Sequence, residues 1–385
     1  MNIVFFSHPS FVVSQSMPRY AQWLASGMKE RGHDITIWKP QPRFYNRPVP
    51  QALKKWLGYV DQFIVFPEFV KKQLKNLPAS TLFVFTDHAL GAWVPLVHDR
   101  PHIIHCHDFL AQQSAAGEIP ENHVSWTGRQ YQALIRRGYR KGKNFISVSY
   151  KTKEDLHSFL DHQPERSEVV YNGLTQAYTT QNKIEARRTM SEFARLSLSE
   201  GYLLHVGGNH WYKNRSGCIK IYNAWRQMGG KLPLLLIGEA PDEQLLLIQQ
   251  ESSFKQDIYF LTGVCDSLLN AAYSGASVFL FPSLAEGFGW PIAEAMACGC
   301  PVITTNEAPM SEVAAGAAWL VPRMPVNNKK EQHTWAINAA IQINEILGRT
   351  VSEQQFSESL GLKNIERFDS QSALNKIEEI YLRIA

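Results

Sequence analysis

Two carboxylates bracket a glycine-rich stretch in the second half of the chain. Glu286 precedes the run Gly-Phe-Gly-Trp at 287–290, and Glu294 follows it. Pro291 suits the first position of a helix, and Gly299 suits the position just beyond its end. The pattern therefore predicts a strand, a loop and a helix of about two turns.

Such a segment could bind a polar ligand, because a helix start offers uncovered backbone N–H groups and partial positive charge. Glu294, about one turn inside the helix, could accept hydrogen bonds from the vicinal hydroxyls of a ribose, and Glu286 lies in the loop and faces the same cleft. Without any ligand, an ordinary turn would explain the glycines at 287 and 289, and a glutamate stabilised by the helix dipole would explain Glu294. Two carboxylates around one strand end favour a ligand site.

A second segment, residues 205–215, has the sequence His-Val-Gly-Gly-Asn-His-Trp-Tyr-Lys-Asn-Arg and leads from a strand into a helix. A lysine at such a loop end, here Lys213, can place its charge on a diphosphate. It would then stabilise the negative charge that develops when a sugar departs. A solvated lysine at a helix start is the structural alternative.

Three histidines, His102, His105 and His107, lie within six residues and invite a zinc hypothesis. In a strand, His105 and His107 share a face whereas His102 points away, so zinc is the lesser interpretation. His107 and Asp108 stand at the strand end, where Asp108 could cap a helix or orient the histidine. A core histidine with a satisfied hydrogen bond is the alternative, and His88 is a weaker candidate of the same kind.

Composition limits the class of protein. A chain of 385 residues has room for two domains, and 44% hydrophobic with 19% charged residues excludes a largely disordered chain. A net charge of +4 is too small to indicate a nucleic-acid-binding protein. No apolar run approaches the ~20 residues of a membrane span, and the N-terminus lacks a signal-peptide pattern. Five scattered cysteines without a Cys-x-x-Cys pair make zinc-ribbon and redox functions weak hypotheses.

Strand and helix patterns alternate along the chain, which predicts an α/β protein with parallel sheets. In the first half, the expected strands are 2–6, 34–38, 81–86, 102–107, 145–149 and 168–171, with helices at 18–31, 128–141 and 151–160. In the second half, the expected strands are 202–206, 232–237, 258–261, 277–281, 301–304 and 318–321. The polar stretch 174–200 marks the expected junction, and an amphipathic helix at 370–384 ends the chain.

The stretch 281–299 closely resembles the Glu-x7-Glu signature of family four, the retaining, nucleotide-sugar-dependent glycosyltransferases with the GT-B fold. The resemblance extends through 261–264, 271–276, 301–306 and 312–313, and so covers essentially the whole C-terminal half. It implies two Rossmann-like parallel-sheet domains that face a central cleft. These are an acceptor domain at 1–175 and a nucleotide-sugar donor domain at 200–369, with a C-terminal helix at 370–385 that could pack back on the first.

The resemblance also implies roles for individual residues. In the family, the glutamate matching Glu294 binds the nucleotide ribose, the one matching Glu286 contacts the donor sugar, and the loop matching 263–265 lies by the base. The implied catalytic residues are Glu286, Lys213 and His107. The implied donor-binding residues are Glu294, Gly287, Phe288, Gly289, Trp290, Val264, Asn209 and Arg215.

Two features depart from the family pattern. The first loop, 10–18, lacks the Gly-Gly pair of many members, so its backbone cannot approach a phosphate as easily. The polar side chains of this loop could instead bind an acceptor. The acceptor-side candidates are Ser14, Gln15 and Asp108. The family's frequent arginine falls at Gly208, and the candidates to replace it are Arg215, Asn209 and His210.

The resemblance implies retaining transfer of a sugar from a GDP- or UDP-linked donor to a hydroxyl of a saccharide or lipid-linked saccharide, in cell-surface polysaccharide or lipopolysaccharide assembly. The leaving phosphate could take the acceptor proton, since no convincing general base is visible. No Asp-x-Asp pair is present, so no metal or other cofactor is expected. The alternatives are a non-catalytic nucleotide-sugar-binding subunit and, more weakly, a dinucleotide-dependent oxidoreductase, against which the lack of Gly-x-Gly-x-x-Gly counts.

A basic run with helical spacing comprises Arg136, Arg137, Arg140, Lys141 and Lys143. A solvated face explains this run better than a membrane-docking face, although a lipid-linked acceptor would favour the membrane. The expected location is the cytoplasm, with peripheral contact at the inner face of the membrane as the alternative. No nucleic acid is expected as a partner.

Overall fold

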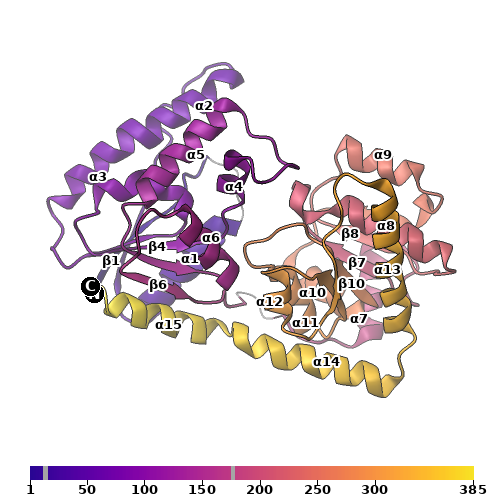
Figure 1. The fold of residues 1–385 in the computed structure, drawn as a ribbon. Helices are drawn as coiled ribbons and strands as arrows, with labels where there is room; N and C mark the ends of the chain where they lie inside the picture. Colours follow the sequence, from indigo (N-terminus) through magenta and orange to yellow (C-terminus); the bar gives the residue numbers. More distant parts are fainter. Residues whose placement is uncertain (12–15, 175–177) are drawn as a thin grey trace. The chain divides into compact units, whose positions relative to one another are not determined.

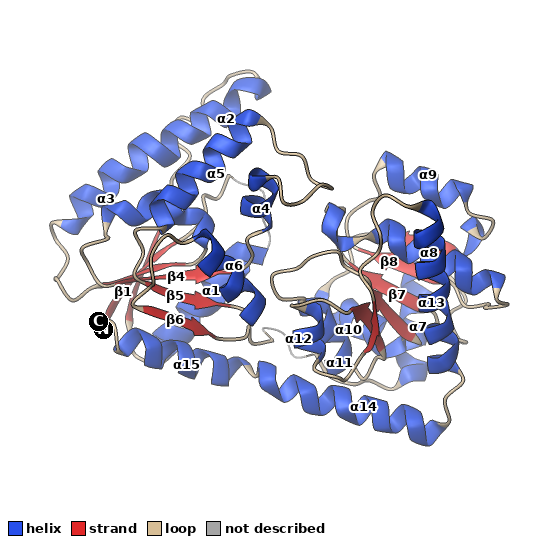
Figure 2. Cartoon of the chain, in the orientation of Figure 1, coloured by secondary structure: helices blue, strands red, loops and turns tan. Residues whose placement is uncertain are grey.

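The computed structural model describes residues 1–11, 16–174 and 178–385, and the chain divides into two units (Figure 1). The first unit comprises Met1–Gly173 together with Ser370–Ala385, and the second comprises Leu174–Asp369. Each unit is a parallel β-sheet flanked by helices (Figure 2). The last helix of the chain thus belongs to the unit in which the chain begins.

The first sheet has six parallel strands in the order β2-β1-β3-β4-β5-β6. They span Asn2–Phe6 (β1), Asp34–Trp38 (β2), Leu82–Phe85 (β3), His102–Cys106 (β4), Asn144–Ser147 (β5) and Arg166–Val169 (β6). β3 is buried along its whole length, as the unbroken apolar run Leu-Phe-Val-Phe requires of a strand covered on both faces.

The helices of the first unit are α1 (Ser16–Glu30), α2 (Gln51–Val60), the π-helical turn η1 (Asp61–Val65), α3 (Phe66–Leu74), the 3-10 helix η2 (His88–Leu96), α4 (Leu110–Ala116), α5 (Trp126–Tyr139), α6 (Tyr150–Phe159) and α15 (Ser370–Leu382). Ser125 and Ser149 cap α5 and α6 by accepting backbone N–H groups of the first turn. The expected helix at 18–31 corresponds to α1, which begins two residues earlier.

α15 packs against α1 and completes the core of the first unit. Its buried residues are Ala373, Leu374, Ile377, Ile380 and Tyr381. The two helices approach closely because Gly27 of α1 has no side chain, and a Cβ atom there would lie 2.6 Å from Leu374. The hydroxyl of Tyr381 lies 2.7 Å from Nε2 of His105 in β4, so α15 also contacts the sheet.

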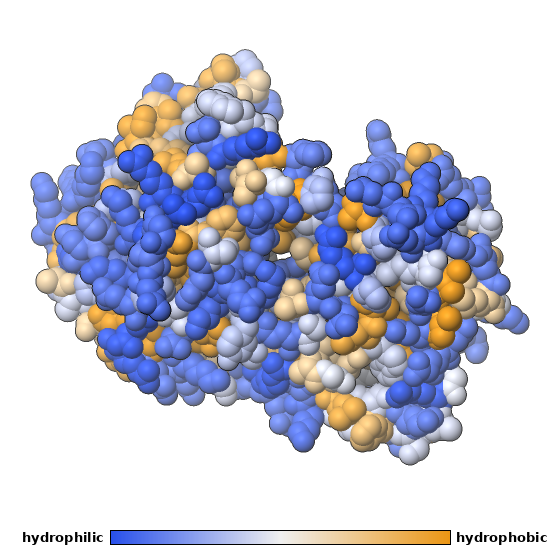
Figure 3. Space-filling view, in the orientation of Figure 1, coloured by the Kyte–Doolittle hydropathy of each residue, from blue (hydrophilic) through white to orange (hydrophobic). Residues whose placement is uncertain are grey.

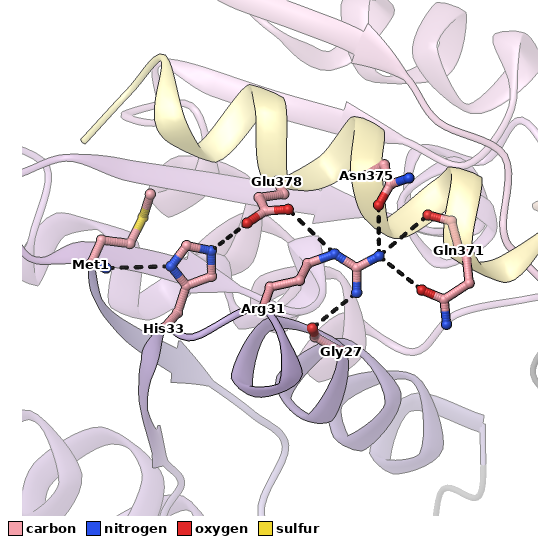
Figure 4. Close-up of polar contacts among 7 residues, drawn as sticks. All are labelled: Met1, Gly27, Arg31, His33, Gln371, Asn375 and Glu378. Carbon is pink, nitrogen blue, oxygen red and sulfur yellow. Dashed lines mark hydrogen bonds and ion pairs between the residues drawn. The ribbon is translucent and has the colours of Figure 1, made fainter.

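Polar side chains fix the register between α1 and α15 (Figure 4). Nη2 of Arg31 donates to the side-chain oxygens of Gln371 at 2.9 Å and Asn375 at 2.7 Å. Glu378 lies 3.3 Å from Nε of Arg31 and 2.8 Å from Nε2 of His33. The contacts of α15 with the first unit are therefore both apolar and ionic.

The second sheet has six parallel strands in the order β12-β11-β10-β7-β8-β9. They span Leu203–Val206 (β7), Leu234–Ile237 (β8), Ile258–Leu261 (β9), Val278–Phe281 (β10), Val302–Thr305 (β11) and Trp319–Val321 (β12). The helices are α7 (Lys183–Ala194), η3 (Trp211–Lys213), α8 (Arg215–Gln227), α9 (Glu243–Glu251), η4 (Lys255–Asp257), α10 (Asp266–Gly275), α11 (Trp290–Ala297), α12 (Met310–Ala314), α13 (Lys329–Leu347), α14 (Val351–Ile365) and η5 (Glu366–Phe368).

The polar stretch 174–200 belongs to the second unit and contains α7, which packs on α10. Only Ala186 and Met190 of α7 are buried, so most of the helix is polar and resembles a linker in sequence. Among the described residues, no helix is both long and apolar enough to span a bilayer.

Candidate functional site

The order of the strands identifies where ligands should bind in the second sheet. From β7 the chain builds outward through β8 to β9, and then returns to the other side of β7 to add β10, β11 and β12. The loops that follow β7 and β10 therefore diverge. Such a switch point leaves a crevice at the carboxyl ends of the strands, where ligands of α/β sheets bind.

Lys213 and Glu286 meet at this switch point. Lys213 ends η3, after β7, and Glu286 lies in the loop after β10. Nζ of Lys213 lies 2.8 Å and 3.0 Å from the two carboxylate oxygens of Glu286, and the side chains are 17% and 8% exposed. The ammonium group also lies 5.3 Å from the ring centroids of Tyr212 and Phe281. The two groups expected to serve different parts of a donor thus form an ion pair with each other.

The glycine-rich loop leads into α11 as the sequence predicts. Gly289 has a φ of +99° and occupies the N-cap position, where the left-handed conformation favours glycine. Phe288 is 4% exposed, and its ring contacts those of Trp290 and Phe368. The side chain of Phe288 is therefore part of the packing.

Glu294 lies in the second turn of α11, and one carboxylate oxygen accepts a hydrogen bond of 2.8 Å from the hydroxyl of Tyr273 in α10. Burial and the neighbouring Glu294 carboxylate raise the pKa of Tyr273 well above its usual value, so the hydroxyl keeps its proton. Tyr273 therefore orients Glu294. A carboxylate has enough lone pairs to accept ligand hydroxyls in addition.

Asn209 and Arg215 hold two loops together. Nη1 of Arg215 contacts the side-chain oxygen of Asn209 and the carbonyl oxygen of Glu239. Asn209 in turn donates to the Glu239 carboxylate at 3.1 Å and to the carbonyl oxygen of Ala240 at 2.6 Å. Both residues line a small pocket of about 110 Å³ between the β7–α8 and β8–α9 loops.

Three further expected positions lie at the same edge of the second sheet. A Cβ atom on Gly208 would lie 3.1 Å from the Glu239 carboxylate, so the position of the family's arginine borders an acidic group. His210 stacks on Tyr212, with ring centroids 5.4 Å apart. Val264 is half-buried in the loop between β9 and α10.

The first sheet has a switch point of its own, between β1 and β3, and three titratable side chains meet there. Asp87 follows β3, and its carboxylate lies 2.9 Å from Nε2 of His8 and 3.0 Å from Nδ1 of His88. It also accepts the backbone N–H of Ala89. Sequence reasoning missed His8 and Asp87, because their contact joins residues 79 positions apart.

Burial and the mutual contacts of Asp87 and the two histidines shift the pKa values of Asp87 and His88. Burial alone would raise the pKa of Asp87, but the hydrogen bond from His8 and the adjacent His88 imidazole outweigh it and hold that pKa well below its usual value. Burial would lower the pKa of His88, but the Asp87 carboxylate outweighs it and raises that pKa. Asp87 is therefore an anion at neutral pH.

The histidines of β4 have protein partners. His102 contacts the carbonyl oxygen of Arg100 and the backbone N–H of Lys143. Both ring nitrogens of His105 contact tyrosine hydroxyls, and burial lowers its pKa to about 3. These contacts occupy the nitrogens that zinc would need. Within the described ranges, no three His, Cys, Asp or Glu side chains are grouped so that they could hold a metal ion.

His107 and Asp108 follow β4 at the carboxyl edge of the first sheet. Nε2 of His107 lies 2.9 Å from the carbonyl oxygen of Thr86, and its ring meets Tyr20 edge-on at 4.4 Å between centroids. Burial lowers the pKa of His107. Asp108 accepts the backbone N–H of Leu110, the first residue of α4, as a capping residue does. Ser14 and Gln15 lie outside the described residues.

Two side chains of the basic run at 136–143 contact residues nearby in the sequence. Arg140 donates to the carbonyl oxygen of Phe159 and lies 3.4 Å from the Asp161 carboxylate. Lys143 lies 3.4 Å from Glu165. These contacts agree with the solvated face that was favoured for this run.

Solved structures share the architecture of the whole chain. The crystal structure of WaaG, a glycosyltransferase involved in lipopolysaccharide biosynthesis, aligns with a TM-score of 0.71 at 16% identity and covers 98% of this chain and 99% of that one. Anabaena HepE in complex with UDP and glucose gives 0.72 at 17% identity and covers 99% of both. The fold is that of the GT-B glycosyltransferases.

Family models narrow the class further. The model described as Glycosyltransferase Family 4 matches residues 17–176, and the one described as Glycosyl transferases group 1 matches residues 200–339. The chain belongs to glycosyltransferase family four.

Two curated relatives are O-antigen chain mannosyltransferases. RfbU of Salmonella typhimurium is 26% identical over 57% of either chain, and mannosyltransferase B of Escherichia coli is 26% identical over 51% of this chain and 52% of its own. The matched region thus spans little more than half of each relative.

Proposed function

We propose that this chain transfers a hexose from a GDP- or UDP-linked donor to a hydroxyl of a saccharide or lipid-linked saccharide during assembly of an O-antigen or similar polysaccharide. The observation that carries the proposal is the contact between Lys213 and Glu286 at the switch point of the second sheet. Family membership and the names of the two mannosyltransferase relatives support it.

In the proposed reaction, Lys213 stabilises the departing diphosphate, Glu294 fixes the ribose and Glu286 orients the sugar. The bond between the anomeric carbon and the diphosphate oxygen breaks with its electron pair on the diphosphate. The acceptor oxygen forms the new bond on the same face of the sugar, and its proton passes to the leaving phosphate. No step uses a metal ion.

The test is turnover by the purified chain. We expect release of a nucleoside diphosphate from one of a panel of GDP- and UDP-linked hexoses when saccharide acceptors are present, at a rate that EDTA does not change. Binding of a donor without turnover would favour a non-catalytic binding subunit. Neither binding nor turnover of any donor would contradict the proposal.

We also propose peripheral contact with an anionic membrane, through α2, η1 and α3 rather than through the basic run at 136–143. These elements form an unbroken helix from Gln51 to Leu74. Leu53, Trp56 and Ile64 on this helix are 50%, 57% and 62% exposed, and Figure 3 shows apolar atoms gathered over it. An exposed apolar face with basic neighbours is typical of a helix that lies in a lipid interface.

Charge favours an anionic surface as the partner of this helix. Residues 39–75 contain eight Lys or Arg and two Asp or Glu, a net charge of +6 in a chain whose total is +4. One of the two acidic residues, Asp61, is buried and accepts backbone N–H groups of Phe44 and Tyr45. Basic residues beside an inserted apolar face add attraction to anionic headgroups.

The double substitution Trp56→Ser and Ile64→Ser should lower the affinity of the full chain for phosphatidylglycerol-containing vesicles by about tenfold. Co-sedimentation with the vesicles measures this affinity. Serine at both Val351 and Phe356, which are 71% and 63% exposed on α14, is the matched control and should leave binding unchanged. Equal losses in the two variants, or equal binding of the parent to phosphatidylcholine vesicles, would contradict this surface.

A further inference from the structure

We infer that the exposed face of α14 is an interface between two copies of this chain, in which the two α14 helices lie antiparallel about a two-fold axis. Four residues of α14 form this face, and we call them the α14 stripe: Glu353, Phe356, Leu360 and Lys363. The stripe combines an apolar centre with one acidic and one basic end. A second copy of the chain is the partner that matches this pattern.

The α14 stripe lies along one face of the helix. Its residues are spaced by three, four and three positions, the spacing that brings side chains to the same side of an α-helix. All four are exposed, with Phe356 at 63% and Leu360 at 39%, and Figure 3 shows apolar atoms over this helix. The opposite face of α14 packs on α11, where Gly361 lies against Met296. The stripe is therefore the side of α14 that its own chain leaves open.

A groove runs beside the α14 stripe, between α14 and the small residues 315–318 that connect α12 to β12. It consists of two adjoining hollows of about 580 Å³ and 550 Å³, and Gly316 and Leu360 border both. Phe356 lines the first hollow and Lys363 lines the second. A Cβ atom on Gly316 would meet no other atom within 4 Å. The groove therefore has room for a large side chain such as Phe356 of a second copy.

The order of residues makes the α14 stripe complementary to itself. A two-fold axis midway along the stripe places Phe356 of one copy against Leu360 of the other. The same axis places Glu353 against Lys363, because both pairs are symmetric about position 358. Each contact then occurs twice, as in any isologous interface. A parallel arrangement would instead bring Glu353 of one copy beside Glu353 of the other, so charge selects the antiparallel one.

The charged ends of the α14 stripe can form these ion pairs. In the part of the chain that the structure describes, Lys363 takes part in no ion pair. Oε2 of Glu353 accepts the backbone N–H of Thr350 at 2.8 Å and so caps the start of α14. A carboxylate has further lone pairs, and Oε1 can accept from an ammonium group while the cap is kept.

Two arginines limit the length of the interface. Arg349 and Arg367 stand one turn beyond the ends of the α14 stripe, and the two-fold axis would place them opposite each other, which like charges disfavour. Arg349 stacks on Trp319 at 4.6 Å, and Arg367 donates to the side-chain oxygen of Asn364 at 2.8 Å. For so short an interface we expect a dissociation constant on the order of 10 µM. Vesicle binding measured well below that concentration is binding of the monomer, so substitutions in α14 do not affect it.

Reversal of one charge at a time tests the pairing in the full chain of 43.8 kDa. Glu353→Lys brings two positive charges together at each end of the interface, and Lys363→Glu brings two negative charges together. We expect each variant to weaken the dimer by about tenfold in sedimentation velocity. An equal mixture of the two variants should form a mixed dimer at least as stable as that of the parent, because every opposed pair is then of unlike charge.

Glu331→Lys is the matched control. Glu331 is also a glutamate in the first turn of a helix, α13, where its carboxylate contacts the side chain of the capping residue Asn328. Its reversal should leave the dissociation constant unchanged. A parent chain that stays monomeric up to about 100 µM, a mixture no more dimeric than its components, or an equal loss in Glu331→Lys would each overturn the interface. None of these measurements requires turnover, so they are independent of the proposed reaction.

Discussion

Replacement of Glu294 by alanine should lower the affinity of the chain for GDP or UDP by at least about 100-fold. The expected loss is large because two hydrogen bonds from ribose hydroxyls to a carboxylate contribute about 1.5–3 kcal/mol each. Isothermal titration calorimetry with the nucleoside diphosphates measures it directly. An unchanged affinity would contradict the ribose role of Glu294.

The contact with Tyr273 supplies the control for this experiment. Glu294→Ala also removes the oxygen to which the buried Tyr273 hydroxyl donates, which should cost about 1–3 kcal/mol of folding free energy. Tyr273→Phe breaks the same hydrogen bond but keeps the carboxylate, so nucleotide affinity should fall far less. Equal losses of affinity in both variants would mean that the orientation of Glu294, rather than its charge, is what the nucleotide requires.

Replacement of Lys213 by alanine should lower kcat for transfer by about 100- to 1,000-fold, because the ammonium group would no longer stabilise the developing charge of the diphosphate. The measurement is steady-state turnover at saturating donor, with the thermal unfolding midpoint as a check on folding. Undiminished transfer would remove Lys213 from the mechanism.

The ion pair with Glu286 makes a second variant necessary. In Lys213→Ala, the Glu286 carboxylate, only 8% exposed, loses its ammonium partner, so part of any loss could come from that charge. Glu286→Gln and the double variant resolve the two effects in a double-mutant cycle. If Lys213 served only to hold Glu286, the double variant would be as active as Glu286→Gln alone. We expect it to be much less active.

This ion pair also suggests what donor binding must accomplish. Without a donor, Glu286 is the anion that neutralises Lys213. A diphosphate that takes over the ammonium group would release the carboxylate to the sugar. Coulomb attraction between groups this close is strong in a partly buried site, so the exchange of one anion for another would avoid an unpaired charge.

The strands of both sheets could be predicted to within two residues because most of them are short apolar runs between helical patterns. The GT-B fold was likewise implied by the residues of the C-terminal half. The helix within the stretch 174–200 was harder to predict, because α7 buries only Ala186 and Met190 and its other positions have the polar composition of a linker. A helix with so narrow an apolar face leaves little periodic signal.

Local pattern indicated the glycine turn at Gly289 and the helix that carries Glu294, since glycine, proline and spacing are local signals. It could not indicate which side chains meet. The partners of Lys213 and Asp87 lie 73 and 79 residues away, and only the strand order brings these loops together. His8 carried no local signal at all, and the burial of the Phe288 ring could not be predicted from the local pattern either.

The return of α15 to the first unit has a consequence for synthesis of the protein. Five buried side chains of the first core, from Ala373 to Tyr381, are translated only after the whole second unit. While the ribosome synthesises the second unit, the part of the first core that α15 later covers therefore stays exposed. Loss of Ser370–Ala385 through a premature stop codon would therefore damage the unit that is translated first.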